Sequence, residues 1–144
     1  MPLTDDEQQQ RRQAVRELMF KTPYIEGMGM VPEVWEADGV RIRLPFDATL
    51  SNDGRVFHGG AIASLMDTAG AAAVWAGHDF DKGAKAATVN MAINYYLGAA
   101  YESDLLAEAR CVKRGKELAF SEISITDAAG KAVASGVLTY RIVP

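Results

Sequence analysis

Cysteine and histidine are scarce in this chain, with one cysteine, Cys111, and two histidines among 144 residues. A single cysteine excludes an internal disulfide framework and is typical of a reducing compartment. So few thiols and imidazoles also argue against a zinc site or another soft-ligand metal site. We therefore expect a protein that works without a metal and without a bound cofactor.

A surplus of positive charge and a long apolar run are also lacking. The formal net charge is −4 and the pI is about 5.1, so nucleic acid is not expected as a partner. No run approaches the roughly 18 apolar residues that span a bilayer. Residues 1–12 lack the basic start and apolar core of a signal peptide. We expect a cytoplasmic protein with no membrane partner.

The length predicts a single domain over residues 1–144, because a chain of this size buries about 70% of its unfolded surface in one core. Thr4, followed three positions later by Glu7, has the pattern of a helix cap and predicts a helix to about Phe20. Thr22-Pro23 ends it, so residues 1–25 form an N-terminal helix and its connection. Apolar alternation predicts strands over 31–36, 40–44, 86–97, 105–112, 118–126 and 132–143.

Residues 56–77 carry only one formally charged side chain, Asp67. Small and apolar residues occupy every face of the predicted helix, which is typical of a buried helix. We therefore expect Asp67 to be carried into the interior, where a carboxylate needs a partner or a shifted pKa. Asp67 is thus the first candidate for chemistry. The alternative is a structural carboxylate that pairs with a buried basic group.

The order of the predicted elements is one helix, two strands, the long apolar helix and about four further strands. Consecutive strands joined by tight turns indicate an antiparallel sheet, so the predicted fold class is α+β. A sheet that curls around the apolar helix would bury it. In the strand over 86–97, strict alternation places Thr88 on one face with Asn90 and Asn94, opposite Met91 and Ile93.

The segment from Asn52 to Asp67 contains His58-Gly59-Gly60, with Asn52 six positions before His58 and Asp67 eight positions after Gly59. A basic turn over 113–116 precedes a strand that ends in a second turn over 127–131. Together these features, over residues 31–140, resemble the hotdog-fold acyl-CoA thioesterases of the phenylacetate-pathway type. The resemblance implies a hotdog fold, in which an antiparallel sheet wraps around one long central helix. It also implies assembly as a homodimer or a dimer of dimers.

The activity implied by the resemblance is hydrolysis of an acyl-CoA thioester, with coenzyme A as part of the substrate. Asp67 matches the catalytic carboxylate, which attacks the thioester or activates water, and the Gly59 N–H matches the donor that polarises the carbonyl. Asn52 and Thr88 match residues that position water or substrate. His58 is a candidate general base or a cap of the following helix. The candidate substrate-binding residues are Gly60, Lys113, Arg114, Gly115 and Lys116.

The chemistry of these residues agrees with the resemblance. A helix N-terminus offers free N–H groups to an oxyanion, and a thiolate leaves readily, so one carboxylate and one oxyanion donor suffice. Gly59 and Asp67 lie about 12 Å apart along one helix, whereas both must lie about 3 Å from the same reacting atoms. If both act, Asp67 must come from a second copy of the chain. The spacing therefore predicts a site at a two-fold interface.

Other interpretations of the same residues stand beside these. Asn52 in an Asn-Asp-Gly sequence is by default a turn residue. The basic turn over 113–116 can be a solvated hairpin tip rather than a grip on the phosphates of coenzyme A. A hotdog hydratase is disfavoured because residues 68–75 contain no histidine. The alternative function is a non-catalytic acyl-CoA binding module, and both aryl-acetyl and medium-chain acyl groups fit the apolar residues.

Overall fold

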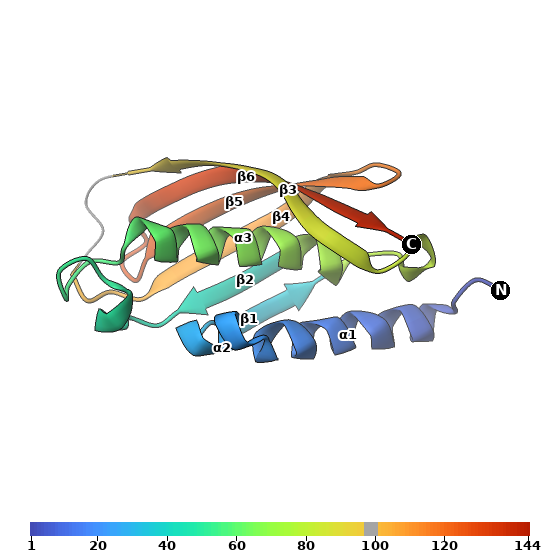
Figure 1. Cartoon of the computed structure of the whole chain (residues 1–144), viewed down its shortest axis with the longest axis horizontal. Coiled ribbons are helices and arrows are strands. Elements are labelled where there is room, and N and C mark those ends of the chain that lie inside the picture. The colour runs from blue at the N-terminus through green and yellow to red at the C-terminus, as the bar shows by residue number, and fades with distance from the viewer. Residues whose placement is uncertain (97–100) are drawn as a thin grey trace.

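One six-stranded antiparallel sheet curls around a single long helix (Figure 1), which confirms the predicted α+β class. The computed structural model describes residues 1–96 and 101–144. The strand order is β1-β2-β4-β5-β6-β3, so β1 and β3 are the edges. Within the described residues, no helix combines the length and apolar character needed to cross a membrane. The elements are α1 (Asp5–Lys21), α2 (Pro23–Met28), β1 (Val31–Glu36), β2 (Gly39–Leu44), η1 (Ala48–Leu50), α3 (Gly59–Ala76), η2 (Phe80–Lys82), β3 (Lys85–Tyr95), β4 (Leu105–Arg114), β5 (Leu118–Asp127) and β6 (Ala132–Val143).

The first helix, α1, begins where the capping pattern predicts. The Thr4 hydroxyl accepts a hydrogen bond from the Glu7 N–H, and the Glu7 carboxylate accepts one from the Thr4 N–H. The helix ends at Lys21, close to the predicted end. Pro23 then begins the short helix α2, where the sequence predicts only a connection. Proline suits the first position of a helix because the N–H it lacks has no partner there.

The central helix, α3, contacts all six strands. Leu65 and Met66 are fully buried under the sheet, and each buried side chain of this size contributes about 1.5–3 kcal/mol. Gly70 allows a close approach, since a β-carbon there would lie 3.0 Å from Leu138 Cδ1. Its carbonyl accepts a hydrogen bond from the Ser121 hydroxyl. These contacts fix the rotation of α3 about its own axis, and with it the side that faces away from the sheet.

That side of α3 is not covered by the sheet, contrary to the expectation of a helix buried all round. Gly60, Ala63, Ser64 and Asp67 recur at helical spacing, and each is half-buried or exposed. The six strands do not close into a barrel, because the edges β1 and β3 are not paired with each other. Asp67 lies on this uncovered side, beside β3 and α1. It is therefore half-buried and is not carried into the interior.

The edge strand β3 is mostly exposed and contains a β-bulge. Nine of its 11 residues are exposed, and it is paired with β6 alone. The register with β6 shifts between Thr88 and Asn90, so Thr88 pairs with Tyr140 and lies on the α3 side, as Met91 does. The predicted placement of Thr88 on the face opposite Met91 is therefore wrong, because a bulge redirects the side chains that precede it. Leu97, the predicted last residue of this strand, lies outside the described residues.

Candidate active site

The N-terminus of α3 presents an unused backbone donor. His58 is the N-cap residue, and its Nδ1 accepts a hydrogen bond of 2.7 Å from the Gly60 N–H. The N–H groups of Ala61 and Ile62 donate to the His58 carbonyl. Within residues 1–96 and 101–144, the Gly59 N–H has no acceptor. It is therefore available, at the positive end of the helix dipole, to a negatively charged oxygen.

The steric reason for glycine is different at position 60 and at position 59 of this turn. A β-carbon on Gly60 would lie 2.9 Å from His58 Nδ1, so the cap itself excludes a larger residue. A β-carbon on Gly59 would meet only the ring of Tyr95, at an ordinary 3.7 Å. The fold of a single chain therefore does not require glycine at position 59. The missing side chain there leaves room for a ligand beside the free N–H.

Asn52 lies in the exposed loop that leads into α3. The Asn52 N–H donates to the Val56 carbonyl at 3.1 Å, and the His58 N–H donates to the Leu50 carbonyl at 2.8 Å. The Asp53 carboxylate accepts two further backbone hydrogen bonds inside the loop. These bonds hold the loop against the start of α3. Across the described part of the chain, the Asn52 side-chain amide has no hydrogen-bond partner, so it is free to meet a ligand.

Asp67 and Thr88 face each other in a cleft between α3, α1 and β3. The Thr88 hydroxyl donates a hydrogen bond of 2.7 Å to Asp67 Oδ1, in the orientation that the bulge in β3 creates. The cleft has a volume of about 530 Å³, which is within the range of small-molecule sites. Among the described residues, Asp67 is the only charged one that lines it. A single carboxylate thus faces a space with mostly apolar walls.

Tyr140 belongs to the same cleft, and neither motif nor spacing revealed it. Its hydroxyl accepts a hydrogen bond of 3.1 Å from Trp75 Nε1. Burial raises the pKa of Tyr140; the hydrogen bond from Trp75 opposes this, and the charge of Asp67 adds to it. The hydroxyl therefore stays protonated and can donate a hydrogen bond. The alternation of Leu138, Tyr140 and Ile142 in the last strand is the signal that could have placed it on the α3 side.

The two groups of candidate residues lie at opposite ends of β3. Gly59 lies beside Tyr95, whose hydroxyl donates a hydrogen bond of 3.1 Å to the Gly59 carbonyl near the end of the strand. Asp67 lies beside Thr88, near the beginning of the strand. Asp67 lies eight positions after Gly59 along α3, a rise of about 12 Å. One chain therefore contains both groups but does not bring them together.

Arg114, expected at the phosphates of coenzyme A, is instead used by the fold. A β-bulge in β4 just before it turns the side chain inward. The guanidinium donates from Nε to the Asp38 carboxylate at 2.9 Å and from a terminal nitrogen to the Val74 carbonyl at 2.9 Å. Arg114 thereby caps the C-terminal end of α3. Because its hydrogen bonds serve this end of the helix, Arg114 does not fit the expected contact with a phosphate.

The other residues of the basic turn are of two kinds, one bonded within the fold and two exposed to solvent. The Gly115 N–H donates to the Leu118 carbonyl and closes the hairpin, so it too is used by the fold. Lys113 and Lys116 are exposed. These two lysines are the members of the turn that can reach a negatively charged ligand.

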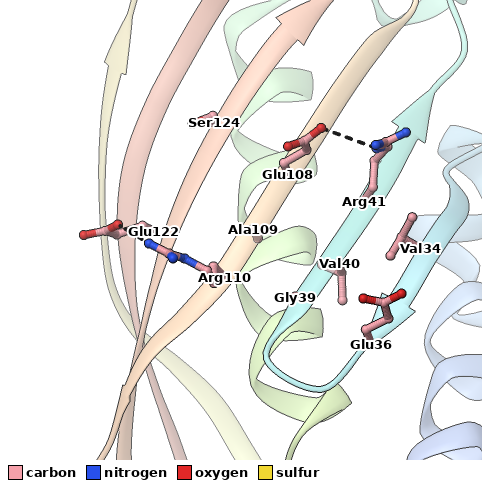
Figure 2. Close-up of a pocket in the computed structure, with 10 residues that line it drawn as sticks. All are labelled: Val34, Glu36, Gly39, Val40, Arg41, Glu108, Ala109, Arg110, Glu122 and Ser124. Atoms are coloured by element: carbon pink, nitrogen blue, oxygen red, sulfur yellow. Dashed lines mark ion pairs between the residues drawn. The ribbon is translucent and has the colours of Figure 1, made fainter.

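A second hollow, of about 380 Å³, lies on the outer face of the sheet, away from α3 (Figure 2). Two ion pairs cross it, Arg41 with Glu108 at 3.4 Å and Arg110 with Glu122 at 3.7 Å. Exposed pairs of this kind contribute about 0–1 kcal/mol to stability. None of the predicted site residues lines this hollow. It is therefore separate from the candidate active site.

A curled antiparallel sheet around one long helix, with a glycine turn at the start of that helix and a carboxylate on its open side, defines a hotdog-fold protein. The model of the Thioesterase superfamily matches residues 54–134. This match begins just before the glycine turn and ends within β6. The chain belongs to the Thioesterase superfamily and is a thioester hydrolase.

Two relatives illustrate the match in sequence. A candidate esterase of Halobacterium salinarum is 35% identical over 116 residues, which are 74% of this chain and 76% of the relative. Human acyl-coenzyme A thioesterase 13 is 35% identical over 80 residues, which are 55% of this chain and 55% of the human protein.

Solved structures show the same fold. The PaaI protein of the Escherichia coli phenylacetic acid degradation operon superposes with a TM-score of 0.81 at 20% identity, over 94% of this chain and 96% of that protein. A hypothetical thioesterase of Streptococcus pneumoniae, solved with coenzyme A, has a TM-score of 0.72 at 19% identity, over 85% of this chain and 95% of that protein. At these identities the likeness establishes the fold.

Proposed function

We propose that this chain hydrolyses acyl-CoA thioesters, with Asp67 as nucleophile or general base and the Gly59 N–H as oxyanion donor. The observation that carries the proposal is the Asp67 carboxylate, held by Thr88 and facing an apolar cleft that has no other charged lining residue among those described. The substrate class is supported by a human relative named as an acyl-CoA thioesterase and by a structural neighbour solved with coenzyme A.

We further propose that the site is completed across a homodimer formed by the edges of β3. Exposed apolar side chains mark this strand, including Val89, 56% exposed, and Tyr95, 50% exposed. An exposed edge of this kind is a surface on which another strand can pair. Two antiparallel β3 strands would continue the sheet through a two-fold axis. The dimer of dimers expected from the resemblance would add a second interface, which the proposed chemistry does not need.

The position of the two groups along β3 supports this pairing. Thr88 and Tyr95 lie at equal sequence distances from the midpoint between Met91 and Ala92. A two-fold axis near this midpoint sets Thr88 of one protomer opposite Tyr95 of its partner. The carboxylate beside Thr88 then faces the free N–H beside the partner's Tyr95. The pairing therefore forms two complete sites in each dimer, each built from both chains.

In the proposed reaction, Thr88 holds Asp67 Oδ1, which leaves Oδ2 to take a proton from water or to attack the thioester carbon directly. The carbonyl oxygen becomes negative and is stabilised by the Gly59 N–H and the α3 dipole of the partner. The C–S bond then breaks, and coenzyme A leaves as a thiolate. When water is the nucleophile, the acyl group leaves as the free acid. When Asp67 is the nucleophile, the acyl group stays bonded to the carboxylate as an anhydride, which water then cleaves to the free acid and Asp67. We assign Asn52, in the loop that leads into α3, to the positioning of the attacking water.

Lys113 and Lys116 are the proposed contacts to the phosphates of coenzyme A, because they are exposed and positively charged. Gly60 contributes through the shape of the turn against which the thioester lies. Arg114 and Gly115 are left out because their hydrogen bonds serve the hairpin and the C-terminal end of α3.

The test is release of free thiol from phenylacetyl-, hydroxybenzoyl-, short-chain and medium-chain acyl-CoA by the wild type and by Asp67→Asn. Loss of the base or nucleophile is expected to lower kcat on the order of 10²–10⁴-fold. Asparagine keeps the shape of aspartate and can still accept a hydrogen bond from Thr88, so the fold should be retained. Glu108→Gln, the same change of chemistry on the outer face of the sheet, is the matched control.

Three outcomes separate the alternatives. Loss of turnover in Asp67→Asn with normal turnover in Glu108→Gln supports the assigned role. Wild-type turnover in Asp67→Asn contradicts it. Binding of acyl-CoA by the wild type in calorimetry, without release of thiol from any ester, would identify a binding module instead.

A further inference from the structure

One apolar side of the Asp67 cleft is built by α1, which lies outside residues 54–134 matched by the family model. Val15, Leu18 and Met19 line the cleft on the α1 side, and Ala71 and Trp75 line it on the α3 side. A helix outside the matched segment thus supplies one whole side of the space beside the candidate catalytic carboxylate.

The N-terminal half of α1 is anchored by buried polar contacts near the end of α3. The buried Gln8 side chain donates to the Asp79 carboxylate at 2.8 Å and accepts from the Phe80 N–H at 2.9 Å. Arg12 Nε donates to the His78 carbonyl at 3.0 Å. These bonds join α1 to the segment that links α3 to β3. They fix this end of the helix in position.

The chain is anchored again just beyond α1. In α2, the Tyr24 hydroxyl shares a hydrogen bond of 2.7 Å with the Ser64 hydroxyl on the open side of α3. Between the two anchors, α1 offers apolar side chains to the cleft, and Leu18 is 68% exposed. A helix held at both ends, with an apolar middle that does not fill the space beneath it, has the form of a pocket wall.

We infer that α1 is the wall of the acyl pocket, and that Val15 and Leu18 set the length and bulk of the acyl group that is hydrolysed. This inference rests on the proposed function, since it requires the thioester carbon to lie at Asp67. The cleft is the apolar surface continuous with that carboxylate, so an acyl group bound there extends along α1. Each methylene that such a wall admits or excludes changes kcat/KM about 10- to 200-fold.

The experiment compares kcat/KM across straight-chain acyl-CoA esters, from acetyl to dodecanoyl, for the wild type and three cleft variants. Val15→Trp fills the cleft and should lower kcat/KM for the longest good substrate, relative to acetyl-CoA, about 10-fold or more. Val15→Ala and Leu18→Ala enlarge it and should move the optimum to longer or bulkier acyl groups. Ala14→Trp, on the exposed outer side of α1, is the control and should keep the wild-type profile.

The outcomes distinguish this inference from the proposed function. Thiol release with an unchanged chain-length profile in all three cleft variants would overturn the role of α1 and leave Asp67 untouched. A wild type that releases no thiol from any ester would overturn the proposed function itself. If Val15→Trp does not fold, as measured by circular dichroism, the two alanine variants still decide the question. A profile shifted equally by Ala14→Trp would show that α1 acts through general distortion and would also overturn the inference.

Discussion

The two ends of α3 differ in how far their terminal backbone groups are hydrogen-bonded by the protein. At the C-terminal end, Arg114 donates to the Val74 carbonyl, and the Gly77 N–H bonds back to carbonyls of the last turn. At the N-terminal end, His58 caps the Gly60 N–H. The N–H of the residue between them, Gly59, is left without an acceptor in the part of the chain that the structure describes.

The difference separates an end whose polar groups serve the fold from an end that, in the proposed function, receives a ligand. A helix end whose polar groups are satisfied by the protein contributes stability. A helix end with an open N–H and no side chain beside it contributes little to stability but can bind an anion. Changes at the N-terminal end should therefore alter turnover, and changes at the C-terminal end should alter the free energy of unfolding.

Among changes at the two ends of α3, the largest effect is expected from removal of the open donor by Gly59→Pro. Proline lacks the N–H, suits the first helical position, and follows His58, whose extended backbone is the conformation favoured before proline. Loss of one oxyanion donor is expected to lower kcat on the order of 10²–10³-fold without loss of stability. Gly59→Ala keeps the N–H and is the control in thiol-release kinetics. Equal losses in both variants would attribute the effect to crowding rather than to the donor.

The same variant tests whether the site is shared between two chains. When Gly59→Pro and Asp67→Asn chains are refolded together, half of the dimers are mixed, and each mixed dimer has one site with both groups intact. Turnover should then recover to about a quarter of the wild-type value. No recovery above the two separate variants would place the whole site within one chain.

A change of stability is expected at the C-terminal end. Arg114→Met removes the hydrogen bonds to Asp38 and to the Val74 carbonyl, and should lower the free energy of unfolding by about 2 kcal/mol in urea titrations. Arg110→Met, which removes an exposed ion pair with Glu122, should change it by about 0.5 kcal/mol or less. Similar values for the two variants would contradict the capping role of Arg114.

The smallest effect on the unfolding free energy is expected from substitution of His78, which lies just after the C-terminal end of α3. Burial lowers the pKa of His78 below the ordinary value of 6.5; its hydrogen bond to Gly83 opposes this, and the charge of Arg114 adds to it. The unfolded chain then binds the proton more readily, so the stability that neutral His78 contributes is present above about pH 6.5 and is lost as the pH falls. His78→Gln should flatten the dependence of the unfolding free energy between about pH 8 and about pH 5. An unchanged slope would contradict this assignment.

Most of the fold is predictable from the sequence because local signals agree with apolar periodicity. The Thr4 cap, the turns and the apolar helix are all set by residues close together in the chain. The helix α2 escapes prediction because Pro23 both ends one helix and suits the start of another. The half-burial of Asp67 is not predictable in this way, because apolar composition does not tell which side of a helix a curled sheet leaves uncovered.

For the candidate site, motif and spacing locate Asp67 and Gly59 but not the side chains around them. Thr88 comes just before a β-bulge in β3, and Arg114 comes just after one in β4. Alternation with a period of two assumes that no residue is inserted, so one bulge reverses the expected face. Tyr140 reaches the cleft from the last strand, far from the motif in sequence. Predicting that Tyr140 reaches the cleft requires the order of strands in the sheet, which the residues next to Tyr140 in sequence do not reveal.

In the proposed dimer, the exposed edge of β3 makes the activity of the site depend on protein concentration. In a lone chain this strand is hydrogen-bonded on one side only, to β6, and edge strands open at a lower free energy than central ones. Thr88, which holds Asp67, is therefore on the strand that a lone chain secures least. Pairing of two β3 strands would suppress that opening by mass action. Dilution would then separate the shared groups and loosen Thr88 in each lone chain, so activity per chain would fall in proportion to dimer content.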